Sequence, residues 1–93
     1  MKKRVVFLDT VHPILFDRLS DAGMACTWET DLGRDAILNG ALSAVHGIVL
    51  RSRLTMDSAV LKSMPKLQWI ARSGAGLENI DTDTASALGI RVI

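Results

Sequence analysis

The chain has 93 residues, of which 48% are hydrophobic and 23% are charged, and its formal net charge is +1. This size allows one domain, and the composition is ordinary for a globular protein with its own core. The near-neutral charge and the scarcity of aromatic side chains argue against a nucleic-acid-binding protein, which needs a basic surface and stacking platforms. The longest apolar runs are only a few residues long, too short for a transmembrane helix.

The cysteine content and the two ends of the chain indicate where the protein acts. The only cysteine, Cys26, excludes an internal disulfide and is typical of a reducing compartment. The start is basic, but Asp9 interrupts the apolar stretch before a signal-peptide core is complete. We therefore expect a cytoplasmic protein. Because the sequence stops at Ile93 as a strand pattern begins, we also expect residues 1–93 to be one domain at the front of a longer protein.

Apolar runs and helical spacings alternate along the whole chain. The runs predict strands at 4–9, 24–29, 47–50, 67–71 and from residue 90 onward. Apolar residues at helical spacing predict helices at 13–22, 33–44, 57–64 and 81–88. Thr10, Asp57 and Asp81 are the expected N-caps of the first, third and fourth helices. Gly23 and Gly89 are placed to end the first and last helices.

This alternation predicts an α/β fold made of βαβ units, with helices on both faces of a parallel sheet. Five strands in this length match a flavodoxin-like doubly wound sheet with the order 2-1-3-4-5. Ligands of such sheets bind beyond the carboxyl ends of the strands, an edge that we call the carboxyl edge. Residues 9–11, 51–53 and 72–76 follow three of the strands. Three arginines and a glycine-rich turn therefore meet at one edge and predict an anion site.

The glycine-rich turn is Ser73-Gly74-Ala75-Gly76. Its glycines allow close approach of the backbone and leave N–H groups free to bind an anion. It is not a dinucleotide fingerprint, because Asn79 stands at the third glycine and the turn follows the fourth strand rather than the first. The pattern favours a small carboxylate bound by backbone N–H groups. A tight turn without a ligand is the alternative.

Arg51-Ser52-Arg53 follows the third strand directly. Two guanidinium groups this close can hold one phosphate or carboxylate in a bidentate manner. A solvated pair at a strand end is the alternative reading, and the neighbouring glycine-rich turn favours the functional one. Arg72 either adds charge to the same site or pairs with Glu78.

Other reactive side chains lack the partners that chemistry requires. His12 and His46 have no convincing acidic orienter, so neither is expected to be catalytic. Cys26 has no histidine in a triad-like setting and is expected to pack, as are Trp28 and Trp69. No metal-ligand spacing is present in the sequence.

Five motifs occur in order along the second half of the chain. They are RSR at 51–53, LKSMPKL at 61–67, RSGAG at 72–76, NID at 79–81 and GI at 89–90. As a set, they resemble the amino-terminal domain of the D-isomer-specific 2-hydroxyacid dehydrogenases, and most closely those members that act on a phosphorylated substrate. The resemblance is strongest over residues 47–93.

The resemblance implies an enzyme that oxidises a 2-hydroxy acid by hydride transfer to NAD, with this domain as its flavodoxin-like substrate-binding lobe. Residues 73–76 resemble the family loop whose backbone amides hold the substrate carboxylate. Arg51 and Arg53, with Ser52 between them, match the basic pair near the substrate phosphate. Asn79 matches a turn of structural importance. Leu54 stands where many members carry threonine, a departure that questions a hydroxyl contact there.

The resemblance also implies that the family's nucleotide-binding domain and its catalytic arginine, glutamate and histidine follow the end of this chain. The chain is therefore expected to bind no cofactor, to contain no catalytic residue and to be inactive alone. Its expected partners are a small phosphorylated or carboxylate substrate and the missing domain. Because a carboxy-terminal segment packs on this lobe in the family, we also expect exposed apolar surface and a homo-oligomer. A non-enzymatic flavodoxin-like binding or self-assembly module is the alternative.

Overall fold

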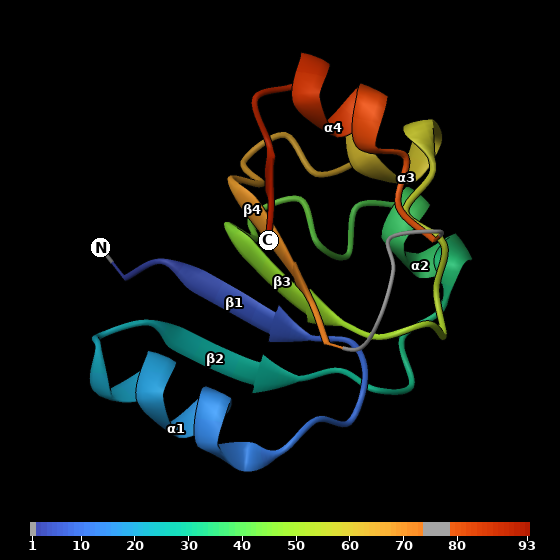
Figure 1. Cartoon of the computed structure of the whole chain (residues 1–93). Coiled ribbons are helices and arrows are strands. Elements are labelled where there is room, and N and C mark those ends of the chain that lie inside the picture. The colour runs from blue at the N-terminus through green and yellow to red at the C-terminus, as the bar shows by residue number, and fades with distance from the viewer. Residues whose placement is uncertain (1, 74–78) are drawn as a thin grey trace.

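A parallel five-stranded sheet organises the chain in the computed structural model, which describes residues 2–73 and 79–93 (Figure 1). The order along the chain is β1 (Arg4–Phe7), α1 (Pro13–Asp21), β2 (Ala25–Trp28), α2 (Arg34–Leu38), β3 (Gly47–Leu50), α3 (Ser58–Lys62), β4 (Trp69–Arg72), α4 (Thr82–Ala87) and β5 (Arg91–Val92). The strands lie in the order β2-β1-β3-β4-β5, and every pairing is parallel. The predicted flavodoxin-like α/β fold is confirmed. No helix of the described residues is long and apolar enough to cross a membrane.

Two hydrophobic clusters lie on opposite faces of the sheet. The larger one joins alternate strand residues such as Ile48 and Ile70 to the buried faces of α2, α3 and α4. The smaller one joins Val5, Phe7 and Val49 to partly buried residues of α1. Figure 1 shows the same division, with α1 on one side and the other helices on the opposite side.

Aromatic rings anchor α1 to the sheet. Phe7 of β1 lies 4.8 Å from Trp28 and 5.2 Å from Phe16, measured between ring centroids. Phe16 of α1 stacks on Trp28 of β2 at 5.1 Å, with only 6° between the planes. Trp28 therefore packs through these ring contacts, and Trp69 packs against the smaller hydrophobic cluster around Val5, Phe7 and Val49, as expected. Even so, α1 contains no buried residue, because this contact covers only part of its surface.

The N-cap of α1 differs from the prediction. His12, not Thr10, caps the helix, and its Nδ1 accepts a hydrogen bond of 3.2 Å from the Ile14 N–H. Pro13 occupies the first helical position because it lacks the N–H that would be left unpaired there. The cap must then be the residue directly before it, and Thr10 lies too far upstream.

Aspartates cap α3 and α4 as predicted. Asp57 accepts from the Val60 N–H at 3.0 Å, and Asp81 accepts from the Thr84 N–H at 3.1 Å. The Val60 bond, followed by an ion pair with Arg34, lowers the pKa of Asp57. The hydroxyl and N–H of Thr84 lower the pKa of Asp81.

The second helix is much shorter than predicted. It ends at Leu38, whereas the apolar spacing predicted a helix to residue 44. Asn39 is its C-cap and Gly40 follows with a φ of 97°, a left-handed conformation that turns the chain out of the helix. Leu42 and Val45 still reach the core from the turns that follow.

Gly47 leaves no room for a side chain at the start of β3. It lies opposite Trp69 in the register of β3 and β4, and a Cβ would overlap the indole ring. Gly47→Ala should therefore lower the free energy of unfolding by about 1–3 kcal/mol, measured by urea denaturation. In a Trp69→Leu background the same substitution should cost clearly less. Equal costs in both backgrounds would show that the ring is not the obstacle.

His46 should make stability pH-dependent near neutrality. Its Nδ1 accepts the Arg4 N–H at 3.0 Å, and burial, followed by the charges of Lys3, Lys66 and Arg4, lowers its pKa from the ordinary 6.5. The imidazole of His46 therefore binds a proton more readily in the unfolded chain than in the folded one. The contribution of neutral His46 to the free energy of unfolding is complete above pH 6.5 and is lost as the pH falls through the lower pKa of the folded state.

Urea denaturation at about pH 7.5 and about pH 5.5 tests this contribution. His46→Asn keeps an acceptor close to the same place but does not titrate. The variant should lose less stability than the parent between the two pH values. An unchanged difference would contradict the assignment.

Candidate functional site

The carboxyl edge brings together the segments that follow β1, β3 and β4. Leu50 pairs with Arg72 at the ends of β3 and β4, and the Ser73 N–H donates to the Leu50 carbonyl at 2.9 Å. The predicted site residues Arg51, Ser52, Arg53 and Ser73 all lie here. The remaining predicted residues, Gly74, Ala75 and Gly76, lie outside the described part of the chain.

A buried carboxylate fixes the turn after β3. Asp9 is only 9% exposed, and its Oδ2 accepts a hydrogen bond from the Arg51 N–H. Its Oδ1 lies 3.5 Å from Nε of Arg53. A buried charge is stable only when it is paired and hydrogen-bonded, and Asp9 meets both conditions. Sequence reasoning placed Asp9 at this edge but gave it no role, although a lone acid beside two arginines was a usable signal.

The guanidinium of Arg53 joins three segments of the chain. Its Nε and Nη2 donate to the Leu8 carbonyl at 3.1 and 2.7 Å, and its Nη1 donates to the Leu32 carbonyl at 2.7 Å. These bonds use three of the five N–H groups that a guanidinium carries, which leaves two for a ligand. Arg53 therefore holds the end of β1 to the turn before α2, and its side chain is 34% exposed.

The side chain of Asn79 joins the turns after β3 and β4. Its Nδ2 donates to the carbonyls of Arg51 and Leu54 at 2.8 and 2.9 Å. Its Oδ1 accepts from Nε of Arg72 at 2.7 Å. The backbone carbonyl of Asn79 accepts from the Met56 N–H at 2.7 Å. Both the oxygen and the nitrogen of the side-chain amide therefore have partners, which fits the structural role inferred for this turn.

The three arginines are therefore not equivalent. Arg53 is bound to backbone carbonyls and Arg72 to Asn79, whereas its other suggested partner, Glu78, is outside the described residues. Arg51 is exposed, and within residues 2–73 and 79–93 its guanidinium has no hydrogen-bond or ion-pair partner. Three positive groups and one carboxylate leave this edge with excess positive charge, which suits an anionic ligand.

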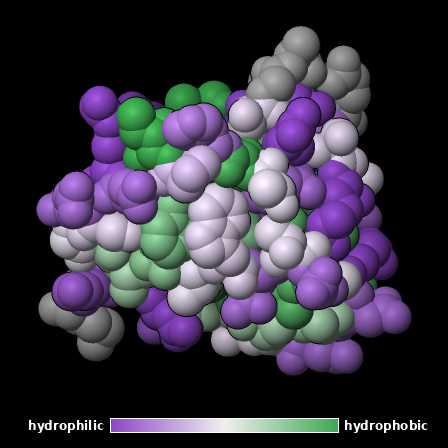
Figure 2. All heavy atoms as spheres, turned by 90° about the horizontal axis from the view of Figure 1, so that it is seen from below, coloured by the Kyte–Doolittle hydropathy of each residue, from purple (hydrophilic) through white to green (hydrophobic). Residues whose placement is uncertain are grey.

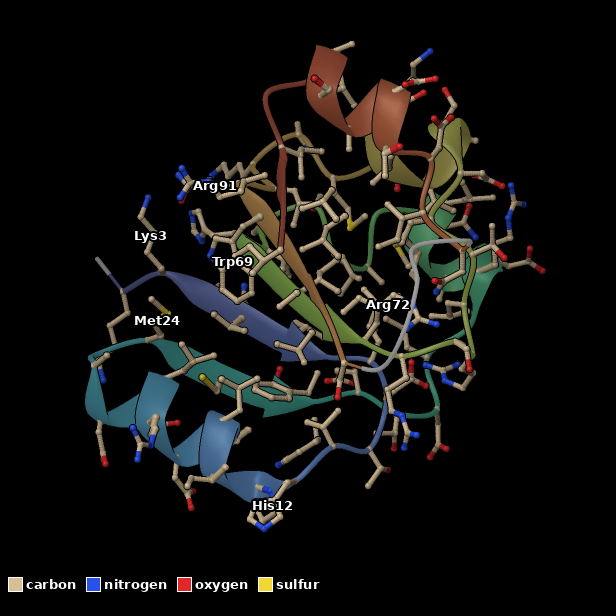
Figure 3. The ribbon with its side chains drawn as sticks, in the orientation of Figure 1. Lys3, His12, Met24, Trp69, Arg72 and Arg91 are labelled. Atoms are coloured by element: carbon tan, nitrogen blue, oxygen red, sulfur yellow. The ribbon has the colours of Figure 1, made fainter. Side chains whose placement is uncertain are left out.

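The histidines and the cysteine do not join this constellation. His12 caps α1, and Figure 3 shows it well apart from Arg72. His46 accepts a backbone N–H at the opposite end of β1, and Cys26 is half-buried in β2. No group of three or more histidine, cysteine, aspartate or glutamate side chains among the described residues could hold a metal ion.

Comparison with known proteins identifies the class. The family described as "D-isomer specific 2-hydroxyacid dehydrogenase, catalytic domain" matches residues 5–93. The chain belongs to this family, which confirms the resemblance seen in the sequence.

Curated relatives are D-3-phosphoglycerate dehydrogenases. The protein of Mycobacterium tuberculosis H37Rv is 35% identical over 89 residues, covering 96% of this chain and 16% of its own length. The Mycobacterium leprae protein is 41% identical over 93 residues, with coverages of 92% and 17%. The human protein is 26% identical over 91 residues, with coverages of 98% and 17%. The chain thus spans about a sixth of the length of these relatives.

Solved structures share the fold. The NAD+-bound 3-phosphoglycerate dehydrogenase of Entamoeba histolytica superposes with a TM-score of 0.85 at 20% identity, over 100% of this chain and 32% of that one. The PH0520 protein of Pyrococcus horikoshii gives 0.89 at 22% identity, over 99% and 27%. At these identities the likeness establishes the fold alone.

Removal of the Asn79 side chain should destabilise the domain. Asn79→Ala leaves the Leu54 carbonyl, which is partly buried, without its donor, and it releases Arg72. We expect a loss of about 1–3 kcal/mol in the free energy of unfolding by urea denaturation. Thr55→Ala, at an exposed position in the same turn, is the matched control and should change little. Equal losses in the two variants would mean that the amide does not hold these turns together.

Proposed function

We propose that residues 1–93 form the substrate-binding lobe of an NAD-dependent 3-phosphoglycerate dehydrogenase, the first enzyme of serine biosynthesis, acting in the cytoplasm. The observation that carries the proposal is the exposed Arg51 guanidinium at the carboxyl edge. The two other arginines there, Arg53 and Arg72, are hydrogen-bonded to groups of the protein. Membership of the dehydrogenase family and the phosphoglycerate dehydrogenases among its relatives support the same reading.

In this proposal the arginines bind the substrate phosphate. The Arg51 guanidinium donates two parallel hydrogen bonds to the phosphate. Arg53 donates the two N–H groups that are not used by its bonds to backbone carbonyls. Ser52 lies between them on the same turn. The substrate carboxylate binds to the backbone N–H groups of residues 74–76, as the family resemblance implies. Ser73 begins this turn, but its own N–H already donates to the Leu50 carbonyl. Arg53 and Asp9 then act mainly by fixing the backbone that carries Arg51.

NAD is proposed to bind outside this chain. A dinucleotide site of the usual kind needs a glycine-rich turn after the first strand, where helix N–H groups meet the pyrophosphate. Residues 8–12 after β1 contain no glycine, and the Asp9 carboxylate there is already held by the Arg51 N–H and the Arg53 guanidinium. NAD held by the nucleotide-binding domain would supply the hydride acceptor. This chain's part is to bind and orient the substrate, and alone it is proposed to be inactive.

Titration of the backbone amides by NMR tests the proposal. We expect 3-phosphoglycerate to shift the amides of residues 51–53 and 73–76, with smaller shifts from glycerate because it lacks the phosphate. A dispersed spectrum that neither ligand perturbs would count against the proposal and would favour a non-enzymatic binding or assembly module. Equal responses to both ligands would point to a 2-hydroxy acid without a phosphate.

A pair of glutamine variants separates binding from scaffolding. Arg51→Gln should weaken 3-phosphoglycerate binding by about tenfold or more, since a charge-assisted hydrogen bond is lost, while the free energy of unfolding stays unchanged. Arg53→Gln should also lower the free energy of unfolding, by about 1–3 kcal/mol, because the carbonyls of Leu8 and Leu32 lose their donors. The assignment is wrong if Arg51→Gln destabilises the fold or leaves binding intact.

A further inference from the structure

The turns after β3 and β4 leave the sheet side by side and meet again beyond it. They start from neighbouring positions, because Leu50 pairs with Arg72 at the ends of the two strands. They meet at a parallel β-bridge between Met56 and Ile80, where the N–H and the carbonyl of Met56 are both hydrogen-bonded to residues 79–81. Each turn is therefore held to the other at both of its ends.

Between these ends, side chains from other segments bind both backbone groups of Arg51. Its N–H donates to the Asp9 carboxylate, and its carbonyl accepts from Nδ2 of Asn79 at 2.8 Å. Oδ1 of the same amide accepts from Nε of Arg72 at 2.7 Å. A planar amide whose oxygen and nitrogen are both bonded keeps its partners in fixed directions. Asn79 therefore fixes the position of the Arg51 backbone relative to the end of β4.

The amide of Asn79 has no donor to offer a ligand. One of its N–H groups is used by the carbonyl of Arg51, and the other is used by the carbonyl of Leu54 at 2.9 Å. An anion at the carboxyl edge must therefore be bound by other groups. Any effect of Asn79 on binding has to come from where it holds the two turns.

These two turns carry the two ends of the substrate in the proposed function, on which this inference rests. The phosphate binds at Arg51, and the carboxylate binds at the turn that Ser73 begins. Figure 2 shows hydrophilic, purple residues along the right of the molecule, the side toward which the arrows of β1, β2 and β3 point in Figure 1. At a polar edge, a short anion gains its affinity chiefly from its charged ends. Both ends bind at once only when their separation matches that of the two turns.

We propose that Asn79 is a positioning residue that determines the length of the substrate. By holding the two turns at one separation, it allows an acid of three carbons with a terminal phosphate to bind with both ends. Phosphoglycolate carries the same two charged groups but is one carbon shorter, so it binds with one end at a time. A fixed separation also reduces the entropy cost of binding the ligand of the right length.

A merely structural role of Asn79 leads to a different result. If Asn79 only stabilised the fold, its loss would reduce the folded fraction of the chain. The apparent affinity for every ligand would then fall by the same factor, and the ratio of two affinities would stay constant. If Asn79 sets the separation of the turns, the ratio between ligands of different length changes. The ratio therefore isolates the positioning role.

Calorimetric titration of the 93-residue chain with 3-phosphoglycerate, phosphoglycolate and inorganic phosphate tests the inference. The parent chain should bind 3-phosphoglycerate more tightly than phosphoglycolate. Asn79→Ala should reduce this preference by about tenfold, the value of one charge-assisted hydrogen bond, and should leave the affinity for inorganic phosphate within about twofold of the parent's. Thr55→Ala, at an exposed position in the turn after β3, is the matched control and should keep the preference.

Asn79→Asp is a second variant for the case in which the alanine variant does not fold by circular dichroism. Aspartate still accepts from Arg72 but cannot donate to the carbonyls of Arg51 and Leu54, so the preference should fall here too. The added charge weakens both phosphorylated acids alike and cancels in the ratio. An unchanged preference in the folded variants overturns this inference alone. A parent chain that binds none of the three ligands overturns the proposed function, and this inference with it.

Discussion

The Asp9 carboxylate at the end of β1 is the group on which the carboxyl edge depends. It accepts the Arg51 N–H and pairs with Arg53, whose guanidinium in turn binds the carbonyls of Leu8 and Leu32. A carboxylate this well buried would be costly if either contact were lost. The turn after β3 is therefore fixed in place, and the exposed Arg51 side chain extends from a rigid base. Such preorganisation reduces the entropy cost of binding a small anion.

The arginines of this edge divide two tasks between them. In the sequence, Arg51 and Arg53 look like an equivalent pair, but the fold makes one a scaffold and leaves the other exposed. Arg72 is a second scaffold through Asn79, which also holds the carbonyl of Arg51. The positive charge of the edge thus comes from all three groups, while the geometry needed to grip a ligand rests chiefly on Arg51.

Much of this arrangement follows from the sequence because local pattern and global fold agree. The alternation of strands and helices predicts the sheet order, and parallel topology alone brings the arginines together. The prediction failed where one residue outweighs a pattern: Gly40 ends α2 early, and Pro13 makes His12 the cap of α1. The hydrogen bonds by which Arg53 joins three segments could not be predicted. One of them goes to the backbone carbonyl of the distant Leu32, and every residue has such a carbonyl, so the sequence does not indicate which one is used.

A crystal structure of the chain with 3-phosphoglycerate tests the central claim most directly. We predict that the phosphate oxygens lie within hydrogen-bond distance of the Arg51 guanidinium, while Arg53 keeps its bonds to the carbonyls of Leu8 and Leu32. A phosphate bound away from the carboxyl edge, or an Arg53 that leaves both carbonyls to bind it while Arg51 stays in solvent, would contradict the division of tasks described above.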